Sequence, residues 1–519
     1  MSLIPSVAPS TSETSTSPSV WQGYRPREYN SSKKVDPSKV EVWACLIMRD
    51  EERNVPSCFS DLSPLVDGFV VSDTGSLDGS VQKAKECAEG KELELFESTW
   101  VNYSHNRNLV MRRMDKVARR RASAKVGLDL NSPLKWEEYQ RLMQYRWFAL
   151  VTDLDNRFHH CKDGENEAKG DEMRDTSEFQ ATVGSKGAVL LDRSSLVDDG
   201  YFIESRRGGA IYRTHNLMRV DPLGIERWCY VRSVHEYCDT LEPWADMRVG
   251  EVEGCYIDYG CSGYRSRDTA RALRDVIHLL RDERLEPGDS RTTFYLAQSY
   301  NEAGCVDKAR HYYQKRAEMA NTWSSERYLS YLKLADLVNR KEAGGDLKYL
   351  QWLCKGFELG LKRLEIGYRI CEYYRLQDLH RMAWSVGRTL INVTSVDSSE
   401  FLIDQAVNGW KFWDTLGVSA YYAGEKYYSY MLTLRALNYS GLNEGERKRL
   451  ESNLRLVEGA LSVEEKERAK CEAEGRSYKP SSTSVNEGEG ERPVYIKLLP
   501  GEGTEGILKA LLVNGSLIK

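Results

Sequence analysis

The spacing of apolar and polar residues differs between the two halves of the chain. In the first half, short apolar runs end in polar, turn-forming residues, at 42–48, 68–72, 93–96 and 147–151. Segments with helical spacing lie between these runs, at 54–61, from Val81 onward and at 103–121. Strands that alternate with helices indicate parallel βαβ units. The first half therefore predicts an α/β domain with a Rossmann-like, mostly parallel sheet.

The second half has the spacing of packed helices over about 266–465, with few prolines and many aromatic residues. Ala297 and Ala309, with Gly304 between them, follow the helix–turn–helix pattern of tetratricopeptide repeats. The pattern recurs after two units of about 37 residues, close to the usual period of about 34, at Tyr374 and Ala383. A further helix pair is predicted over 417–437. Because such repeats bury a core only against their neighbours, we expect one curved all-α domain.

These patterns divide the chain into four parts. Residues 1–38 are rich in Ser, Thr and Pro and have almost no apolar periodicity, so we expect a disordered lead. The α/β domain is expected at 39–256 and the helical repeats at 257–465. Residues 466–519 lose periodicity and contain a Glu/Gly-rich run, so this tail is expected to be largely disordered.

Composition narrows the class of protein. The 519 residues carry a net charge of −5, which argues against a general nucleic-acid binder. No apolar run reaches the roughly 18 residues of a membrane span, and no secretory signal is evident. The 12 cysteines are scattered and do not form a disulfide framework. A reducing, cytoplasmic setting is the resulting expectation.

Two carboxylates follow the apolar run at 147–151. Asp153 and Asp155 are two residues apart, so in an extended chain their side chains lie on the same face. Adjacent carboxylates are costly unless a cation lies between them, and Mn²⁺ or Mg²⁺ with substrate phosphates suits such a pair. A solvated turn is the alternative explanation. Acidic residues also follow two other predicted strands, at 50–52 and at Asp73.

The sequence resembles the family-two glycosyltransferases, which have the A-type fold. The resemblance rests on Cys45 to Glu52 as the opening strand, on the Asp-Thr-Gly-Ser-Leu-Asp-Gly turn at 73–79, and on Trp100 with Arg107-Asn108. It also rests on Asp-Leu-Asp at 153–155 and on Val-His-Glu-Tyr at 234–237. The last motif, with the helical half, resembles the branch that fuses this domain to tetratricopeptide-like repeats and includes peptide-cysteine glycosyltransferases. The likeness covers roughly 42–455. Asp50 and Asn156 depart from it, since the family usually has Asn and Glu there.

The resemblance implies roles for individual residues. Asp50, Glu51 and Asp73 would bind the nucleotide of the donor, and Arg107 would face its phosphates or only align Asp153. Asp153 and Asp155 would hold Mn²⁺ or Mg²⁺ on the diphosphate. His235 is either a further metal or phosphate contact or a histidine with a structural role. Glu236 is the candidate general base, and Asp155 is counted with it as catalytic. The rival candidates for the base are Asp198, Asp199 and Glu204.

The leading hypothesis is therefore a metal-dependent, inverting glycosyltransferase. A UDP-sugar is the expected donor, a peptide, protein or glycan the expected acceptor, and a homodimer through the helical repeats a further expectation. Two alternatives stay open. One is a non-catalytic repeat scaffold whose glycosyltransferase-like domain binds nucleotide-sugar or protein partners. The other is a different nucleotide enzyme, such as a nucleotidyltransferase.

Overall fold

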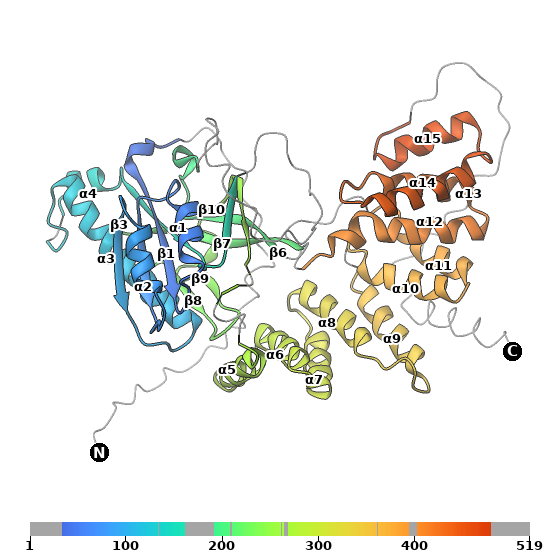
Figure 1. The fold of residues 1–519 in the computed structure, drawn as a ribbon, viewed down its shortest axis with the longest axis horizontal. Helices are drawn as coiled ribbons and strands as arrows, with labels where there is room; N and C mark the ends of the chain where they lie inside the picture. The colour runs from blue at the N-terminus through green and yellow to red at the C-terminus, as the bar shows by residue number, and fades with distance from the viewer. Residues whose placement is uncertain are drawn as a thin grey trace.

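The chain folds into a sheet domain followed by a run of helices (Figure 1). The computed structural model describes residues 34–132, 134–160, 191–207, 210–260, 262–263, 268–360, 362–393 and 402–478. The expected α/β domain with a helical domain after it is confirmed at this level. The expected disordered lead lies almost wholly outside the described residues.

The described strands of the first domain form an eight-stranded sheet and a separate two-stranded sheet. The large sheet has the strand order β3-β2-β1-β4-β7-β6-β10-β5. Its strands are β1 (Val40–Met48), β2 (Gly68–Asp73), β3 (Glu92–Glu97), β4 (Arg146–Val151), β5 (Arg157–His160), β6 (Gly200–Arg207), β7 (Ala210–Val220) and β10 (Val249–Asp258). The small sheet pairs β8 (Trp228–Val231) with β9 (Tyr237–Thr240).

The large sheet is mixed rather than mostly parallel. The pairings β2–β3, β1–β2, β1–β4 and β6–β10 are parallel. The pairings β4–β7, β6–β7 and β5–β10 are antiparallel. Only two residues separate β6 from β7, and a connection this short can join only antiparallel neighbours. The first four strands in the order thus form the expected parallel half, whereas the pairings of the other half are antiparallel except for β6–β10.

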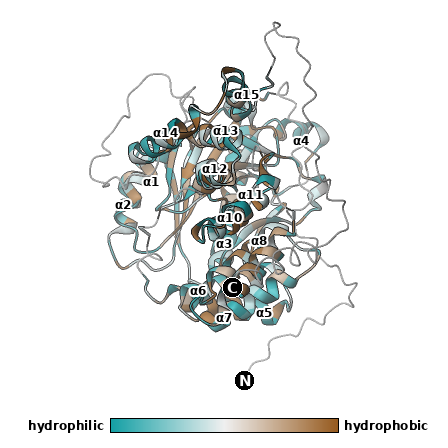
Figure 2. Ribbon diagram, turned by 90° about the vertical axis from the view of Figure 1, so that its right-hand side faces the viewer, coloured by the Kyte–Doolittle hydropathy of each residue, from teal (hydrophilic) through white to brown (hydrophobic). Residues whose placement is uncertain are grey.

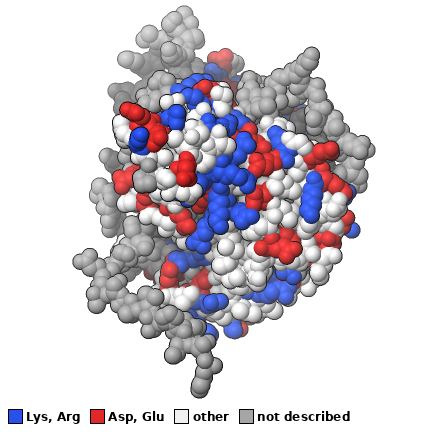
Figure 3. Space-filling view, turned by 90° about the vertical axis from the view of Figure 1, so that its left-hand side faces the viewer, with Lys and Arg blue, Asp and Glu red and all other residues white. Residues whose placement is uncertain are grey.

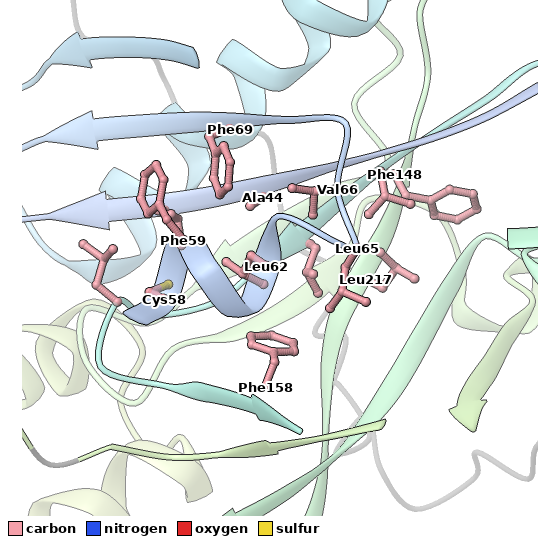
Figure 4. Close-up of a cluster of buried hydrophobic side chains, with 14 of the residues drawn as sticks. Ala44, Cys58, Phe59, Leu62, Leu65, Val66, Phe69, Phe148, Phe158 and Leu217 are labelled. Atoms are coloured by element: carbon pink, nitrogen blue, oxygen red, sulfur yellow. The ribbon is translucent and has the colours of Figure 1, made fainter. Parts of the chain in front are cut away.

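Helices cover both faces of the parallel half. Along β1, Val42, Ala44 and Leu46 pack in one buried cluster with α1 (Val55–Leu62), and Trp43 packs on the other face with α3 (Tyr103–Val126). A strand that is buried on both faces needs a continuous apolar run, as β1 has. Figure 4 shows the first of these clusters, where Phe59 and Phe69 stack with their ring centroids 4.2 Å apart.

The helix α3 carries a dense group of basic residues towards its carboxyl end. It runs five residues past its expected end at Arg121 because Gly127, with φ 65°, supplies a left-handed cap. Figure 3 shows the face of the molecule that carries this helix, with Lys and Arg in a stripe beside Asp and Glu. Many of these cations are paired: Arg113 donates to Glu94 at 2.8 Å and Arg120 also pairs with Glu92 and Glu94. The other described helices here are α2 (Ser80–Cys87) and α4 (Trp136–Leu142).

The second domain is a series of helices in which each packs on the next from α5 to α14, and the last helix, α15, packs on α13. These are α5 (Arg271–Leu285), α6 (Ser290–Glu302), α7 (Val306–Glu318), α8 (Ser324–Asp336), α9 (Gly345–Phe357), α10 (Glu365–Leu376), α11 (His380–Gly387), α12 (Phe412–Ala423), α13 (Lys426–Leu437), α14 (Glu444–Glu458) and α15 (Val463–Ala473). Figure 2 shows that these helices carry both hydrophobic and hydrophilic residues, as amphipathic helices do.

The expected repeat register agrees with these helices. Ala297 on α6 and Ala309 on α7 are fully buried, and Gly304, with φ 73°, forms the turn between them. The pair α10–α11 repeats this arrangement, with Ala383 fully buried, and α12–α13 corresponds to the pair expected at 417–437. The second half is thus a domain of tetratricopeptide-like helix pairs.

Two expected boundaries fall inside elements. The boundary at 256 lies in β10, and the boundary at 465 lies in α15, which continues to Ala473. The capping box of Ser462 and Glu465 begins α15, and Ala469 and Ala473 are buried on its inner side. None of the helices in the described ranges is both long and apolar enough to cross a bilayer.

Candidate functional site

The expected site lies at the carboxyl ends of β1, β2 and β4, where three acidic turns meet. The turns after β1 and β2 are bonded to each other. Asp50 accepts a hydrogen bond from the Leu77 amide at 2.6 Å, and the Asp50 amide donates to the Ser76 hydroxyl at 3.0 Å. Asp73, which is only 4% exposed, accepts from the Ser76 hydroxyl at 2.6 Å. The structure therefore uses Asp50 and Asp73 to shape this turn.

Asp153 and Asp155 leave the end of β4 next to each other. The side chain of Asp153 is 42% exposed, whereas Asp155 is more deeply placed and accepts a hydrogen bond from the Gly263 amide at 3.0 Å. Burial, and then the negative charge of Asp153, raise the pKa of Asp155 above its ordinary value. The Asn156 amide donates to the Asp153 carbonyl at 3.2 Å, so the two carboxylates lie in a turn after β4 rather than in the extended chain that the spacing suggested, yet they are close enough to repel each other.

The segment after β10 closes over this carboxylate pair. A Cβ atom added at Gly263 would lie 2.9 Å from Asp155 Oδ2 and 3.1 Å from Glu51 Oε1, so both carboxylates approach the same glycine. A Cβ atom at Gly260 would lie 1.8 Å from the carbonyl oxygen of Asp155. Position 260 therefore requires glycine because the contact is with backbone, whereas a side chain at position 263 would displace the ends of the two carboxylate side chains. This contact brings Glu51 to Asp155, although the two residues end different strands.

Arg107 on α3 joins Asp153 to Glu236. Its Nη2 donates to Asp153 Oδ1 and its Nε donates to Glu236 Oε1, both at 2.8 Å. Arg107 is buried, and burial disfavours its charge. The two carboxylates outweigh that penalty and raise the pKa of Arg107 well above its ordinary value. The candidate base and the candidate metal ligand thus share one guanidinium.

His235 does not join the carboxylate pair in a metal site. Its ring stacks on Tyr295 of α6, with centroids 4.0 Å apart and an angle of 11° between the ring planes. Within the ranges that the structure describes, no group of three or more His, Cys, Asp and Glu residues could hold a metal ion. The expected set of Asp153, Asp155 and His235 is therefore not a preformed three-ligand site. The imidazole ring of His235 instead packs against Tyr295 of α6.

The rival candidates for the base lie elsewhere or are paired. The carbonyl of Asp199 accepts from the Arg219 amide, and Arg219 is level with Phe148 near the start of β4. Asp153 follows the other end of that strand, about five residues or ~16 Å along it. Asp198 lies next to Asp199, so neither can act beside Asp153. Glu204 accepts from Arg206 at 2.7 Å.

Sequence reasoning did not find a polar ladder that supports the end of β4. The side chains of Ser205, Thr214 and Asn216 are linked by hydrogen bonds, and Asn216 donates to the Val151 carbonyl at 2.8 Å. The Tyr259 hydroxyl donates to Thr214 at 3.4 Å, and burial, together with the charge of Asp153, raises the pKa of Tyr259. These residues come from β6, β7 and the segment after β10. No local motif connects them, so only the strand register could have shown their proximity.

A separate pocket lies beside α3 on the side of β7 and β8. It contains about 420 Å³ of empty space, its open mouth included, and Asp115, Arg112, Glu226, Arg227 and Trp228 are among its lining residues. Burial, and then the charges of Glu226 and Asp221, raise the pKa of Asp115 to about 7. None of the expected site residues lines this pocket.

Comparison with known proteins gives no family. No protein-family model matches the sequence, and no curated protein matches it. Among solved structures, a thermophilic TPR protein of Thermus thermophilus matches with 14% identity and a TM-score of 0.23, over 36% of this chain and 91% of that one. BtubC of P. vanneervenii matches with 17% identity and a TM-score of 0.28, over 44% and 100%. MamA matches with 12% identity and a TM-score of 0.24, over 38% and 95%. Similarities at this level support no conclusion about function.

Proposed function

We propose that this chain is a metal-dependent glycosyltransferase that moves a sugar from a nucleotide-diphosphate sugar to an acceptor. The observation that carries the proposal is the carboxylate pair Asp153–Asp155 at the end of a buried parallel strand, with Glu51 beside it and Arg107 on Asp153. Ligands in α/β sheets bind at the carboxyl ends of such strands. The motif likeness to family-two glycosyltransferases supports the same function.

The donor set suits Mn²⁺ or Mg²⁺. Both ions take oxygen ligands, and Mg²⁺ is usually bound through one or two carboxylates plus substrate phosphates. Asp153 and Asp155 provide the carboxylates, and the partial exposure of Asp153 leaves room for phosphate oxygens on one side. When bound, the ion would neutralise charge that develops on the leaving diphosphate. A three-ligand protein cage is not required for this chemistry.

The remaining residues take roles that follow from their contacts. Arg107 keeps its charge and lies on Asp153, so it would orient that ligand and add positive charge near the diphosphate. Glu236 is the proposed base because it shares Arg107 with Asp153 and so belongs to the same side-chain cluster. Asp50 and Asp73 would stabilise the turn that carries Leu77, a residue that is 92% exposed. This turn would form one wall of the nucleotide-binding site.

The donor and acceptor classes are also part of the proposal. A UDP-sugar is the proposed donor, and a peptide, protein or glycan held partly by the helical domain is the proposed acceptor. Contact between copies of the chain would use the same helices, and the proposed setting is the cytoplasm.

Calorimetry of UDP binding with Mn²⁺ and with EDTA tests the function directly. We expect binding that requires the metal, and we expect Asp155→Ala to abolish it together with sugar transfer. Removing one of two repelling carboxylates should leave the metal-free protein equally stable or more stable. The matched control is Asp414→Ala, since Asp414 pairs with Arg449 on the helical domain, remote from the sheet. Wild-type protein that binds no nucleotide with Mn²⁺, and an Asp155→Ala variant that is merely less stable, would refute the proposal.

One observation favours the alternative of a non-catalytic scaffold. Asp153 already pairs with Arg107, and Asp155 already accepts from Gly263, so both carboxylates have partners within the protein. In a scaffold these contacts would be permanent, and Mn²⁺ would not raise the melting temperature in the presence of any nucleotide-sugar. In the proposed enzyme the metal would displace them, and the melting temperature would rise with both ligands present.

A further inference from the structure

The loop that carries Glu236 has a backbone that needs support. It joins β8 to β9, and within it Arg232 has φ 75° and His235 has φ 52°. Left-handed conformations are costly for residues other than glycine and persist only where surrounding contacts hold them. Two such residues within four positions predict that another part of the structure fixes this loop.

The support comes from the first helices of the second domain. The Ser233 amide and hydroxyl donate to the buried Asp282 of α5, at 2.9 and 2.6 Å. Arg232 pairs with Glu286 at 2.7 Å and with Asp289 at 3.0 Å. Val234, only 2% exposed, packs in the same apolar cluster as the residues of α6 and α7. The loop thus belongs to the core of the helical domain, although it is part of the sheet domain in sequence.

Helix α6 contacts the residues on both sides of Glu236. Arg291 Nη2 donates to the His235 carbonyl at 3.0 Å, and its guanidinium lies over the Tyr237 ring at 4.8 Å. The same guanidinium lies 4.9 Å from the ring of Tyr295, on which His235 stacks. One arginine and one tyrosine therefore hold the carbonyl and the ring of His235, directly before Glu236, and the arginine also contacts the ring of Tyr237, directly after it.

We propose that Arg291 and Tyr295 are positioning residues for the candidate site, so that the helical domain completes it. The contacts run from α6 to the loop, from Glu236 to Arg107 and from Arg107 to Asp153. If Glu236 moved away, Arg107 would keep Asp153 as its acceptor and would neutralise that carboxylate more fully. Asp153 would then attract a cation less strongly. This last step rests on the proposed function, whereas the support of the loop does not.

The first test measures the loop and needs no ligand. Hydrogen exchange of the amides at 228–240 should become faster in Arg291→Lys and Tyr295→Leu, and should be unchanged in Tyr295→Phe, which keeps the ring. The control is Arg435→Lys, because Arg435 also lies over a ring, that of Trp413 at 3.6 Å, and donates to two carbonyls. Unchanged exchange in Arg291→Lys and Tyr295→Leu, or the same increase in Arg435→Lys, would overturn the proposal.

The second test measures Mn²⁺ affinity in the presence of UDP. Residues that orient metal ligands typically change metal affinity about 10–100-fold, and we expect a loss of this size in Arg291→Lys and Tyr295→Leu. In a Glu236→Gln background, Arg291→Lys should cause little further loss, because both substitutions interrupt the same path. Fully additive losses would overturn the path through Glu236. Faster loop exchange in the variants, combined with wild-type protein that binds no Mn²⁺ with UDP, would support the positioning role and overturn the proposed function.

Discussion

The substitution Arg107→Met removes the guanidinium that joins Glu236 to Asp153 and keeps an unbranched apolar chain in its place. The side chains of Arg107 and Glu236 are 9% and 10% exposed, so their pair is buried. Removing one partner of a buried pair costs about 3–5 kcal/mol, because the other charge stays behind without compensation. Asp153 is 42% exposed, so its pair adds only about 0–1 kcal/mol. We therefore expect a loss of about 3–5 kcal/mol in the free energy of unfolding, mostly from Glu236.

Urea unfolding at neutral pH measures this loss in four proteins: wild type, Arg107→Met, Glu236→Gln and the double variant. The double variant should be more stable than Arg107→Met alone, because glutamine carries no charge that needs a partner. Arg120→Met is the control, since Arg120 is 53% exposed and its pairs should contribute no more than about 1 kcal/mol.

Two results would refute this reasoning. One is an Arg107→Met protein within about 0.5 kcal/mol of wild type, the range typical of surface substitutions. The other is a double variant that is no more stable than Arg107→Met, since Glu236 would then not be the source of the cost.

Three further predictions concern the core and the pocket. Ala309→Leu should cost about 1–3 kcal/mol because Ala309 is fully buried between helices, whereas Ala343→Leu in an exposed turn should not, and equal melting temperatures would show that the packing is misassigned. Burial lowers the pKa of His215 to about 3, so stability should fall as pH drops below about 6.5, by up to about 1.4 kcal/mol per pH unit, and His215→Leu should remove this slope in denaturant titrations. Burial raises the pKa of Asp115 to about 7, so its contribution has the opposite sign and stability is lost as pH rises from about 4 to 7. Asp115→Asn should therefore stabilise the protein at pH 8 and not at pH 4, and a gain that does not depend on pH would contradict the assignment.

The sequence predicts those parts of the fold that depend on local periodicity. The run at 42–48 identifies β1 because a strand buried on both faces is apolar throughout. The repeat register follows from small residues at fixed intervals, and Ala297 and Ala309 are indeed fully buried. The short connection from β6 to β7 indicates an antiparallel pair, but the insertion of β7 beside β4 does not follow from the sequence, because these strands are far apart in the chain.

The site is predictable to a smaller extent. The spacing of Asp153 and Asp155 places both at one strand end, and the salt bridge from Arg107 to Asp153 is one of the two roles that the sequence suggests for that arginine. The contacts of Gly263 and of Arg291 join residues far apart in sequence, so no local sequence pattern predicts them. The stacking of His235 is also not predictable from local sequence, because its partner, Tyr295, belongs to the other domain.

The charges on β3 have a consequence for how the protein behaves at high concentration. β3 is the edge of the large sheet, and edge strands can recruit strands from other molecules. Glu92 and Glu94 alternate along this edge and are held by Arg113 and Arg120. A strand of a second copy that added to β3 would have to accommodate these charged side chains and disturb their ion pairs, which disfavours the pairing. This edge is therefore protected against sheet-to-sheet aggregation, and the protection should weaken in high salt, where exposed ion pairs are screened.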